Sequence, residues 1–148
     1  MVDFKDKKWF ILYSILIVLF DQILKYIVEV LNLNIVLSSF FSLVYIKNQG
    51  AAFGILHGFQ WLFILIALIV FGIMIYYYKK INNNKILLLV SWSLIIGGLL
   101  GNLIDRIFRG YVVDYISFSF WPAFNVADSC LVVGVILLLY VFWRIDSI

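Results

Sequence analysis

Four long apolar stretches, separated by shorter and more polar segments, dominate the chain. They cover residues 9–28, 59–78, 86–104 and 126–143. A helix needs about 20 mostly apolar residues to cross the hydrocarbon core of a bilayer. Each stretch is close to that length, so the pattern predicts four transmembrane helices. We expect residues 1–148 to form a single integral membrane domain.

The segments that follow the first and third apolar stretches have a different pattern. Residues 35–46 and 111–120 are rich in Val, Ile, Phe, Tyr and Ser, which is typical of strands. Turn signals, Asn48-Gln49-Gly50 and Arg109-Gly110, flank them. The predicted fold class is therefore an all-α membrane protein with a small β platform. We expect this platform to comprise about residues 34–56 and 110–121 and to rest on the outer face of the membrane.

The distribution of Lys and Arg predicts the orientation, because cytoplasmic segments are enriched in these residues. One predicted side carries Lys5, Lys7, Lys8, Lys79, Lys80, Lys85 and Arg144. The other side carries Lys47, Arg106 and Arg109. We therefore expect both termini in the cytoplasm and the β platform outside.

Composition supports the membrane interpretation. Apolar residues make up 66% of the chain and charged residues 13%, whereas roughly a quarter of a soluble domain is charged. The net charge is +3, but the cations lie at the ends of apolar stretches, so we expect no nucleic-acid partner.

Cys130 is the single cysteine, and His57 has no second ligand at metal-binding spacing. We expect no metal and no cofactor.

Acidic residues within or beside the spans need an explanation, because a carboxylate in hydrocarbon is costly. They are Asp21, Glu29, Asp105, Asp114 and Asp128. Asp21 and Lys25 are four residues apart, so they share a helix face. They could be an ion pair that holds helices together or the lining of a polar site, and the two interpretations are compatible. The pattern assigns no role to Glu29.

The third span combines small and polar residues. Gly97 and Gly101 have the spacing that lets another helix approach closely. Asn102, Asp105 and Arg106 continue as a polar stripe at the outer end of the same helix. Asp105 and Arg106 could simply be a solvated cap. Asn102 lies about one turn deeper and needs a partner, since an unpaired amide in lipid is expensive.

Asp114 lies in a predicted strand and Asp128 at the start of the fourth span, so both should lie near the outer membrane boundary. Two carboxylates that converge there could share one proton. Such a pair supplies the acid and the base that water activation on an amide requires. Asn125 can cap the fourth helix and place Asp128 in its first turn, where negative charge is favoured. We therefore expect Asp128 to be the more readily ionised partner and Asp114 the more readily protonated one.

Five sequence blocks stand in order along the chain: Phe20–Tyr26, Lys47–Gly54, Gly97–Arg106, Gly110–Tyr115 and Pro122–Ser129. They resemble the bacterial lipoprotein signal peptidases (signal peptidase II), a family of intramembrane aspartic peptidases. Their order around four spans makes the resemblance specific over nearly the whole chain. In that family the catalytic aspartates stand in V-V-D and F-N-x-A-D-S motifs. The resemblance thus implies that Asp114 and Asp128 are catalytic.

The resemblance also implies the supporting residues and the substrate. The supporting or substrate-binding residues would be Asp21, Lys25, Asn48, Gly50, Ala52, Phe53, Asn102, Asp105, Arg106 and Asn125. The substrate would be a prolipoprotein whose lipobox cysteine carries diacylglycerol, cut on the amino side of that cysteine. The location would be the bacterial cell membrane, with the site near the outer face. We expect a monomer.

The block that begins at Asn48 has two interpretations. Asn48-Gln49-Gly50 could be only a turn, or it could shape and contact the substrate, with Ala51 and Ala52 permitting the close approach of an extended peptide. We favour the second.

Two other functions fit a small membrane protein with buried carboxylates. A proton-coupled transporter could use them as a relay, but the carboxylates gather at one membrane face, and no paired repeat is evident. An assembly protein could use buried charges only to pair helices. That interpretation leaves Asp114 and Asp128 without cationic partners apart from Arg106.

Overall fold

The computed structural model describes residues 4–50, 56, 58–80 and 86–146. This part of the chain contains four helices long and apolar enough to cross a membrane, together with one four-stranded sheet. The helices are α1 (Phe4–Val30), α2 (Gln60–Lys80), α3 (Ile86–Phe108) and α4 (Val126–Asp146). The predicted fold class, four spanning helices with a small β platform, is confirmed.

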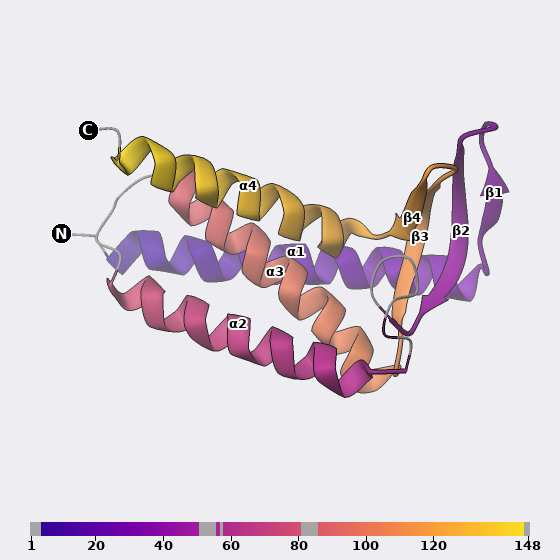
Figure 1. Ribbon diagram of the computed structural model, residues 1–148, viewed down its shortest axis with the longest axis horizontal. Helices are drawn as coiled ribbons and strands as arrows, with labels where there is room; N and C mark the ends of the chain where they lie inside the picture. The colour runs from indigo at the N-terminus through magenta and orange to yellow at the C-terminus, as the bar shows by residue number, and fades with distance from the viewer. Residues whose placement is uncertain (1–3, 51–55, 57, 81–85, 147–148) are drawn as a thin grey trace.

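The helices form a bundle with the sheet at one end (Figure 1). The start of α1 and the end of α4 lie together at the opposite end. Helix α3 is the central helix, because 61% of its span window is buried within the protein, against 22%, 11% and 17% for α1, α2 and α4. The outward faces of the other helices expose large apolar side chains, as contact with lipid requires.

All four helices extend beyond their predicted spans, and α1 and α3 extend furthest. Helix α1 begins at Phe4, five residues before the predicted start at residue 9, because a helix can continue through charged residues that a lipid core would exclude. Helix α3 continues to Phe108. The amides of Arg109 and Gly110 both donate to the carbonyl oxygen of Asp105, at 2.8 and 3.2 Å. Gly110 has a φ of 76°, the left-handed conformation that ends many helices.

Small residues let the bundle pack closely around α3. A Cβ atom on Gly97 would lie 2.7 Å from the side chain of Ile17, and one on Gly101 would lie 2.7 Å from Oδ2 of Asp21. The expected close approach of another helix at these glycines is confirmed, and that helix is α1. Gly98 faces the other way, where a Cβ would collide with the backbone oxygen of Ala127 at the start of α4.

The sheet is antiparallel, with the strand order β1-β2-β3-β4. Its strands are β1 (Asn34–Val36), β2 (Phe41–Asn48), β3 (Val112–Phe118) and β4 (Trp121–Phe124). The first predicted strand is divided in two, because Ser38 accepts the amide of Phe41 at 3.1 Å and closes a tight turn. The second predicted strand is followed by β4, which the pattern did not indicate.

The sheet packs against the end of α1 through a small core of Val28, Val113 and Tyr115. In the pairing of β2 with β3, Ile46 lies opposite Asp114 and Asn48 lies opposite Val112. Residues two apart on a strand point to the same face, so Asn48 is a diagonal neighbour of Asp114. The register of the sheet thus brings the Asn48 side chain to the Asp114 carboxyl group.

Candidate active site

Asn125 contacts both acids of the predicted pair. Its side-chain amide donates a hydrogen bond to Oδ1 of Asp114 at 2.7 Å, and its backbone N–H donates to Oδ2 of Asp128 at 3.2 Å. One acid belongs to β3 and the other to the first turn of α4. The two carboxyl groups therefore meet around a single residue at the sheet end of the bundle.

The local sequence explains why Asn125 adopts this position. Its Oδ1 accepts the backbone amide of Asp128 at 2.9 Å, so Asn125 caps α4 as expected. Asp128 reaches back to the amide of Asn125, which completes the reciprocal arrangement of a capping box. The helix start therefore fixes the backbone of Asn125 and Asp128 together and leaves the Asn125 amide nitrogen free to reach β3.

Asp114 is almost fully buried, with 1% of its surface exposed. Its Oδ2 accepts the side-chain amide of Asn48 at 2.8 Å. Burial, and then the negative charge of Asp128, raise the pKa of Asp114 to about 7. A carboxyl group with this pKa can hold or release a proton near neutral pH.

Asp128 is more exposed than Asp114 and accepts a second hydrogen bond from Nδ2 of Asn102, at 2.7 Å. Asn102 lies on α3, so this contact joins three elements at the site. The ion pairs among the described residues all involve other carboxylates, and neither Asp114 nor Asp128 has Lys or Arg within 4.0 Å. The pair is therefore held by neutral amides and is not neutralised by a salt bridge.

Lys25 is the centre of a buried ion cluster next to the pair. Its Nζ lies 2.7 Å from Oδ2 of Asp21 and 2.8 Å from Oδ2 of Asp105, and all three side chains are 0% exposed. The same Nζ donates to Oδ1 of Asn102 at 2.8 Å. The Asp21–Lys25 couple thus both joins helices and lines the polar site. The alternative in which Asp105 is a solvated cap is wrong, because burial next to Lys25 removes it from water.

The two carboxylates of this cluster also hold the backbone on either side of the acid pair. Oδ2 of Asp105 accepts the amide of Val113 at 3.3 Å. Oδ1 of Asp21 accepts the amide of Ala127 at 3.0 Å. Val113 and Ala127 immediately precede Asp114 and Asp128 in the chain. The ion cluster therefore positions both acids through their neighbours.

Arg106 lies beside the site without forming an ion pair. Its Cζ is 5.0 Å from the centre of the Phe63 ring on α2, and its Nη1 makes a long bond of 3.5 Å to the backbone oxygen of Asn102. Its Nε is buried and has no hydrogen-bond partner. The cation is close enough to Asp114 and Asp128 to interact with both electrostatically.

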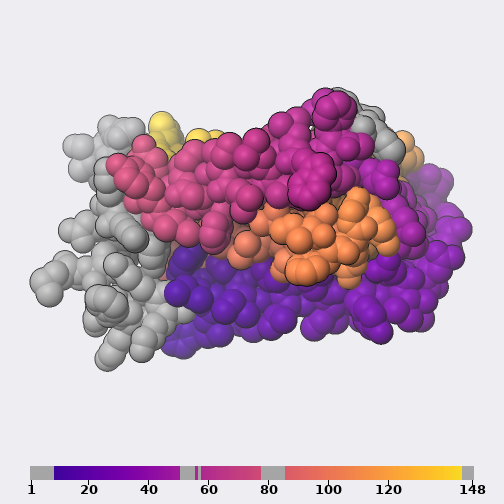
Figure 2. Space-filling model, turned by 90° about the horizontal axis from the view of Figure 1, so that it is seen from below, coloured from indigo at the N-terminus to yellow at the C-terminus, as the bar shows by residue number. Residues whose placement is uncertain are grey.

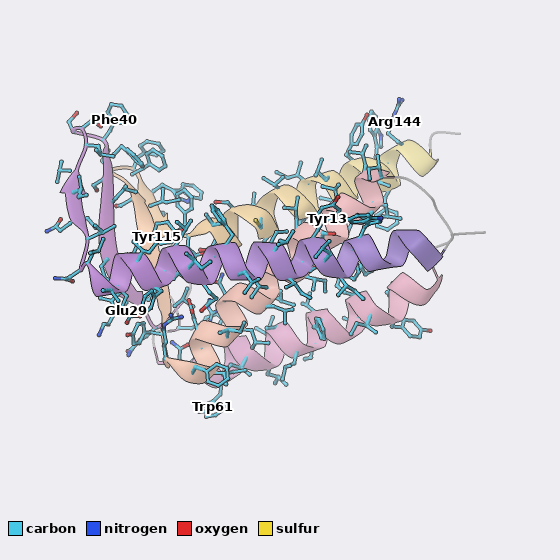
Figure 3. The ribbon with its side chains drawn as sticks, turned by 180° about the vertical axis from the view of Figure 1, so that it is seen from behind. Tyr13, Glu29, Phe40, Trp61, Tyr115 and Arg144 are labelled. Carbon is cyan, nitrogen blue, oxygen red and sulfur yellow. The ribbon has the colours of Figure 1, made fainter. Side chains whose placement is uncertain are left out.

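Sequence patterns missed a second polar cluster, which joins α1 to the sheet. Oε1 of Glu29 accepts the hydroxyl groups of Tyr45 at 2.7 Å and Tyr111 at 2.6 Å. Oε2 of Glu29 accepts Nε of Arg109 at 3.2 Å. Figure 3 shows Glu29 at the sheet end of α1, far from Arg144. Burial, and then hydrogen bonds to the Tyr111 hydroxyl and to Glu29, raise the pKa of Tyr45, so this hydroxyl remains protonated and continues to donate.

Gln22 is a further polar residue that the sequence did not single out. Its Nε2 donates to the backbone oxygen of Gly101 and to Oδ1 of Asp105, both at 3.0 Å. Its Oε1 accepts Nη1 of Arg109 at 2.9 Å. Gln22 lies one residue after Asp21, and that proximity to a buried charge was the available signal.

The turn after β2 is described only in part. Oδ1 of Asn48 accepts the amide of Gly50 at 2.9 Å, so the side chain that binds Asp114 also shapes the turn. Ala52 and Phe53, two of the expected supporting residues, lie outside the described residues, as does His57. Within the described ranges, no three His, Cys, Asp or Glu side chains gather in an arrangement that could hold a metal ion.

Known proteins of one family resemble this chain over most of its length. The family model described as signal peptidase (SPase) II matches residues 13–144. A lipoprotein signal peptidase of Halothermothrix orenii is 44% identical over 138 residues, which covers 90% of this chain and 94% of that protein. One of Streptococcus agalactiae is 44% identical over 140 residues, covering 90% and 91%.

A solved structure has the same fold. It is described as a bacterial membrane enzyme determined by the in meso method at 2.3 Å resolution. It superposes with a TM-score of 0.86 at 34% identity and covers 95% of this chain and 90% of that one.

Proposed function

The chain belongs to the lipoprotein signal peptidase (signal peptidase II) family, and we propose that Asp114 and Asp128 are the catalytic pair of this peptidase. The observation that carries the proposal is the double contact of Asn125, which donates to both carboxyl groups at 2.7 and 3.2 Å. A pair held in this way can share one proton, so one member acts as acid and the other as base.

The environments of the two acids suggest how the roles divide. Asp114 is buried and its pKa is raised to about 7, which favours the protonated form. Asp128 accepts hydrogen bonds from Asn102 and from the backbone of Asn125, and it lies in the first turn of α4, where negative charge is favoured. In the proposed resting state Asp114 therefore carries the proton and Asp128 is ionised.

The reaction follows from this division. Asp128 accepts a proton from water while the water oxygen attacks the carbonyl carbon of the scissile bond, and Asp114 donates its proton to the carbonyl oxygen. The tetrahedral intermediate then collapses. The carbon–nitrogen bond breaks, the amine leaves with the proton that Asp128 accepted, and Asp114 recovers its own proton from the hydroxyl group.

The proposed substrate is a prolipoprotein whose lipobox cysteine carries diacylglycerol, cut on the amino side of that cysteine. A site at the end of apolar helices suits a peptide bond anchored by acyl chains, because each buried methylene contributes about 0.8 kcal/mol of binding. An apolar groove of about 470 Å³ lies between α1, α2 and α3 and reaches Ile104, which adjoins Asp105. The mostly apolar side chains that line this groove can contact the acyl chains of the substrate.

The proposal includes the location. The chain is a multi-pass membrane protein, and we place it in the bacterial cell membrane with both termini in the cytoplasm. Lys and Arg near the helix ends away from the sheet support this orientation. The sheet and the acid pair would then lie at the outer face. We propose a monomer of one domain, because the close-packing face of Gly97 and Gly101 is already occupied by α1.

A cleavage assay tests the proposal. The purified protein in lipid is given a lipobox peptide whose cysteine carries diacylglycerol, and the masses of the products locate the cut. We expect a product that begins at the lipidated cysteine and no product from the same peptide without lipid. Cleavage at another bond, or equal cleavage of both peptides, would contradict the proposed substrate.

A further inference from the structure

Gln60, the first residue of α2, has a buried side-chain amide that makes no hydrogen bond. Both its Nε2 and its Oε1 are shielded from solvent and lack a partner. A buried amide that forms neither of its hydrogen bonds costs free energy and is rare in folded proteins. Gln22 is a contrasting case in the same protein, because both ends of its amide are bonded. A bound ligand would supply the two hydrogen bonds that the Gln60 amide lacks.

Gln60 lies on the face of α2 that packs against α3. It precedes Phe63 by three residues and Ile64 by four, which places all three on one side of the helix. Ile64 packs in a cluster with Leu103 of α3, and the Phe63 ring lies 5.0 Å from the guanidinium carbon of Arg106. Gln60 is therefore at the end of the α2–α3 contact that lies nearest the acid pair.

The views of the molecule agree with this position. Figure 3 shows Trp61, the neighbour of Gln60, beside the C-terminal end of α3. Figure 2 shows that same end of α3, in orange, at the surface between α2 and α1. The start of α2 thus borders the open side of the segment that carries Arg106.

Arg106 contacts the face of α2 that carries Gln60, and it also interacts with the acid pair. Its own Nε is buried without a partner, and its charge interacts with Asp114 and Asp128. The start of α2 and the end of α3 therefore present two unpaired donors, Nε2 of Gln60 and Nε of Arg106, and one unpaired acceptor, Oε1 of Gln60. These groups lie at the same end of the α2–α3 contact, where Phe63 is 5.0 Å from Arg106, and this shared position indicates one polar subsite.

The hydrogen-bond donors and acceptors of these groups determine which kind of ligand can satisfy them. The ester groups of diacylglycerol offer only acceptors, so they would leave Oε1 of Gln60 unpaired. A peptide unit offers one N–H and one C=O, and it can satisfy both ends of the amide. We infer that Gln60 is a substrate-binding residue that holds a main-chain peptide unit of the precursor next to the scissile bond. This inference rests on the proposed peptidase function.

Paired substitutions of two glutamines test the inference. Methionine has nearly the shape of glutamine and no hydrogen-bonding amide, so Gln60→Met should leave the melting temperature unchanged or raise it. KM for the diacylated lipobox peptide should rise about tenfold with kcat within about twofold of wild type, because a substrate hydrogen bond is lost. Gln22→Met is the matched control, and it should lower the melting temperature. A similar drop in Gln60→Met, or an unchanged KM, would overturn the inference.

A second series identifies the ligand group. Single amide-to-ester replacements along the peptide, outside the scissile bond, each remove one N–H. One replacement should weaken binding by wild type about tenfold and have no further effect on Gln60→Met. A dialkyl-ether analogue lacks the lipid carbonyl groups and should show no such coupling. Coupling to the ether analogue, or to no peptide position, would contradict the assignment to a peptide unit.

The outcomes separate this inference from the proposed function. If wild type does not cut the diacylated peptide, the proposed function fails. If wild type cuts it, Asp114→Asn does not, and Gln60→Met matches wild type, then the inference about Gln60 alone is wrong.

Discussion

Nζ of Lys25 lies 2.8 Å from Oδ1 of Asn102, and this contact fixes which way the Asn102 amide faces. A lysine ammonium group can only donate, so the oxygen of the amide must face it. The amide nitrogen then faces Asp128, at 2.7 Å. A buried cation on α1 thereby orients the donor that stabilises the ionised form of Asp128.

Lys25 should accordingly be essential for stability. The substitution Lys25→Met leaves Asp21 and Asp105 as buried charges without their shared cation, and removing one partner of a buried ion pair costs about 3–5 kcal/mol. We expect a large fall in the free energy of unfolding, measured by thermal unfolding in detergent. Lys47→Met is the control, because Lys47 is exposed and forms no ion pair among the described residues. Equal stabilities of the two variants would show that the cluster is not needed.

The raised pKa of Asp114 predicts a pH dependence. If Asp114 must be protonated and Asp128 ionised, kcat/KM should fall about tenfold per pH unit above pH 7, and it should fall again at low pH once Asp128 takes up a proton. The folded state should also lose stability, but between about pH 3.8 and pH 7, below the range in which the activity falls. Because folding raises the pKa of Asp114 from 3.8 to about 7, its contribution is complete below pH 3.8 and is lost as the pH rises through 7.

Substitution of Asn48 tests the pH profile of kcat/KM, because it should shift the profile in a known direction. Its hydrogen bond to Oδ2 of Asp114 favours the ionised carboxylate and lowers the pKa. In Asn48→Ala the pKa of Asp114 should rise, so the fall in kcat/KM should move to higher pH. Ser39→Ala, in the exposed turn of the first hairpin, should leave the profile unchanged. A shift of the Asn48→Ala profile to lower pH is the result that the proposed role of Asp114 does not allow.

The contact between α3 and α4 predicts a strong effect at Gly98. A methyl group there would collide with the backbone oxygen of Ala127, next to Asp128. Gly98→Ala should therefore lower the free energy of unfolding by about 1–3 kcal/mol and reduce cleavage, because α4 must shift. Gly72→Ala on α2 is the control, since nothing lies within 4 Å of its added methyl group. If Gly98→Ala behaves like Gly72→Ala, close packing at this position is not required.

The sequence predicted the spans and the strand and helix that carry Asp114 and Asp128, because both depend on local patterns. Apolar length identified the helices, and the cap at Asn125 is a short-range motif. The partner of Asp105 could not be predicted in this way. Its contact with Lys25 joins residues 80 positions apart, and only the folded bundle brings them together.

Local sequence patterns also failed to predict other features of the folded protein. The sequence assigned no role to Glu29, but the register of the sheet brings Tyr45 and Tyr111 to it. Strand β4 is four residues long and contains Pro122, so its pattern is too short and too irregular to predict a strand. Gln60 carries no signal in the sequence, because an unpaired amide is visible only when its surroundings are known.

The central claim is that Asp114 and Asp128 work as one proton-sharing pair, and the most direct measurement is cleavage of the diacylated lipobox peptide by Asp114→Asn and Asp128→Asn. Asparagine keeps the shape of each side chain and removes its titrating group. We predict that both variants unfold at temperatures close to that of wild type and show no detectable cleavage. Cleavage by either folded variant at a rate near that of wild type would contradict the claim.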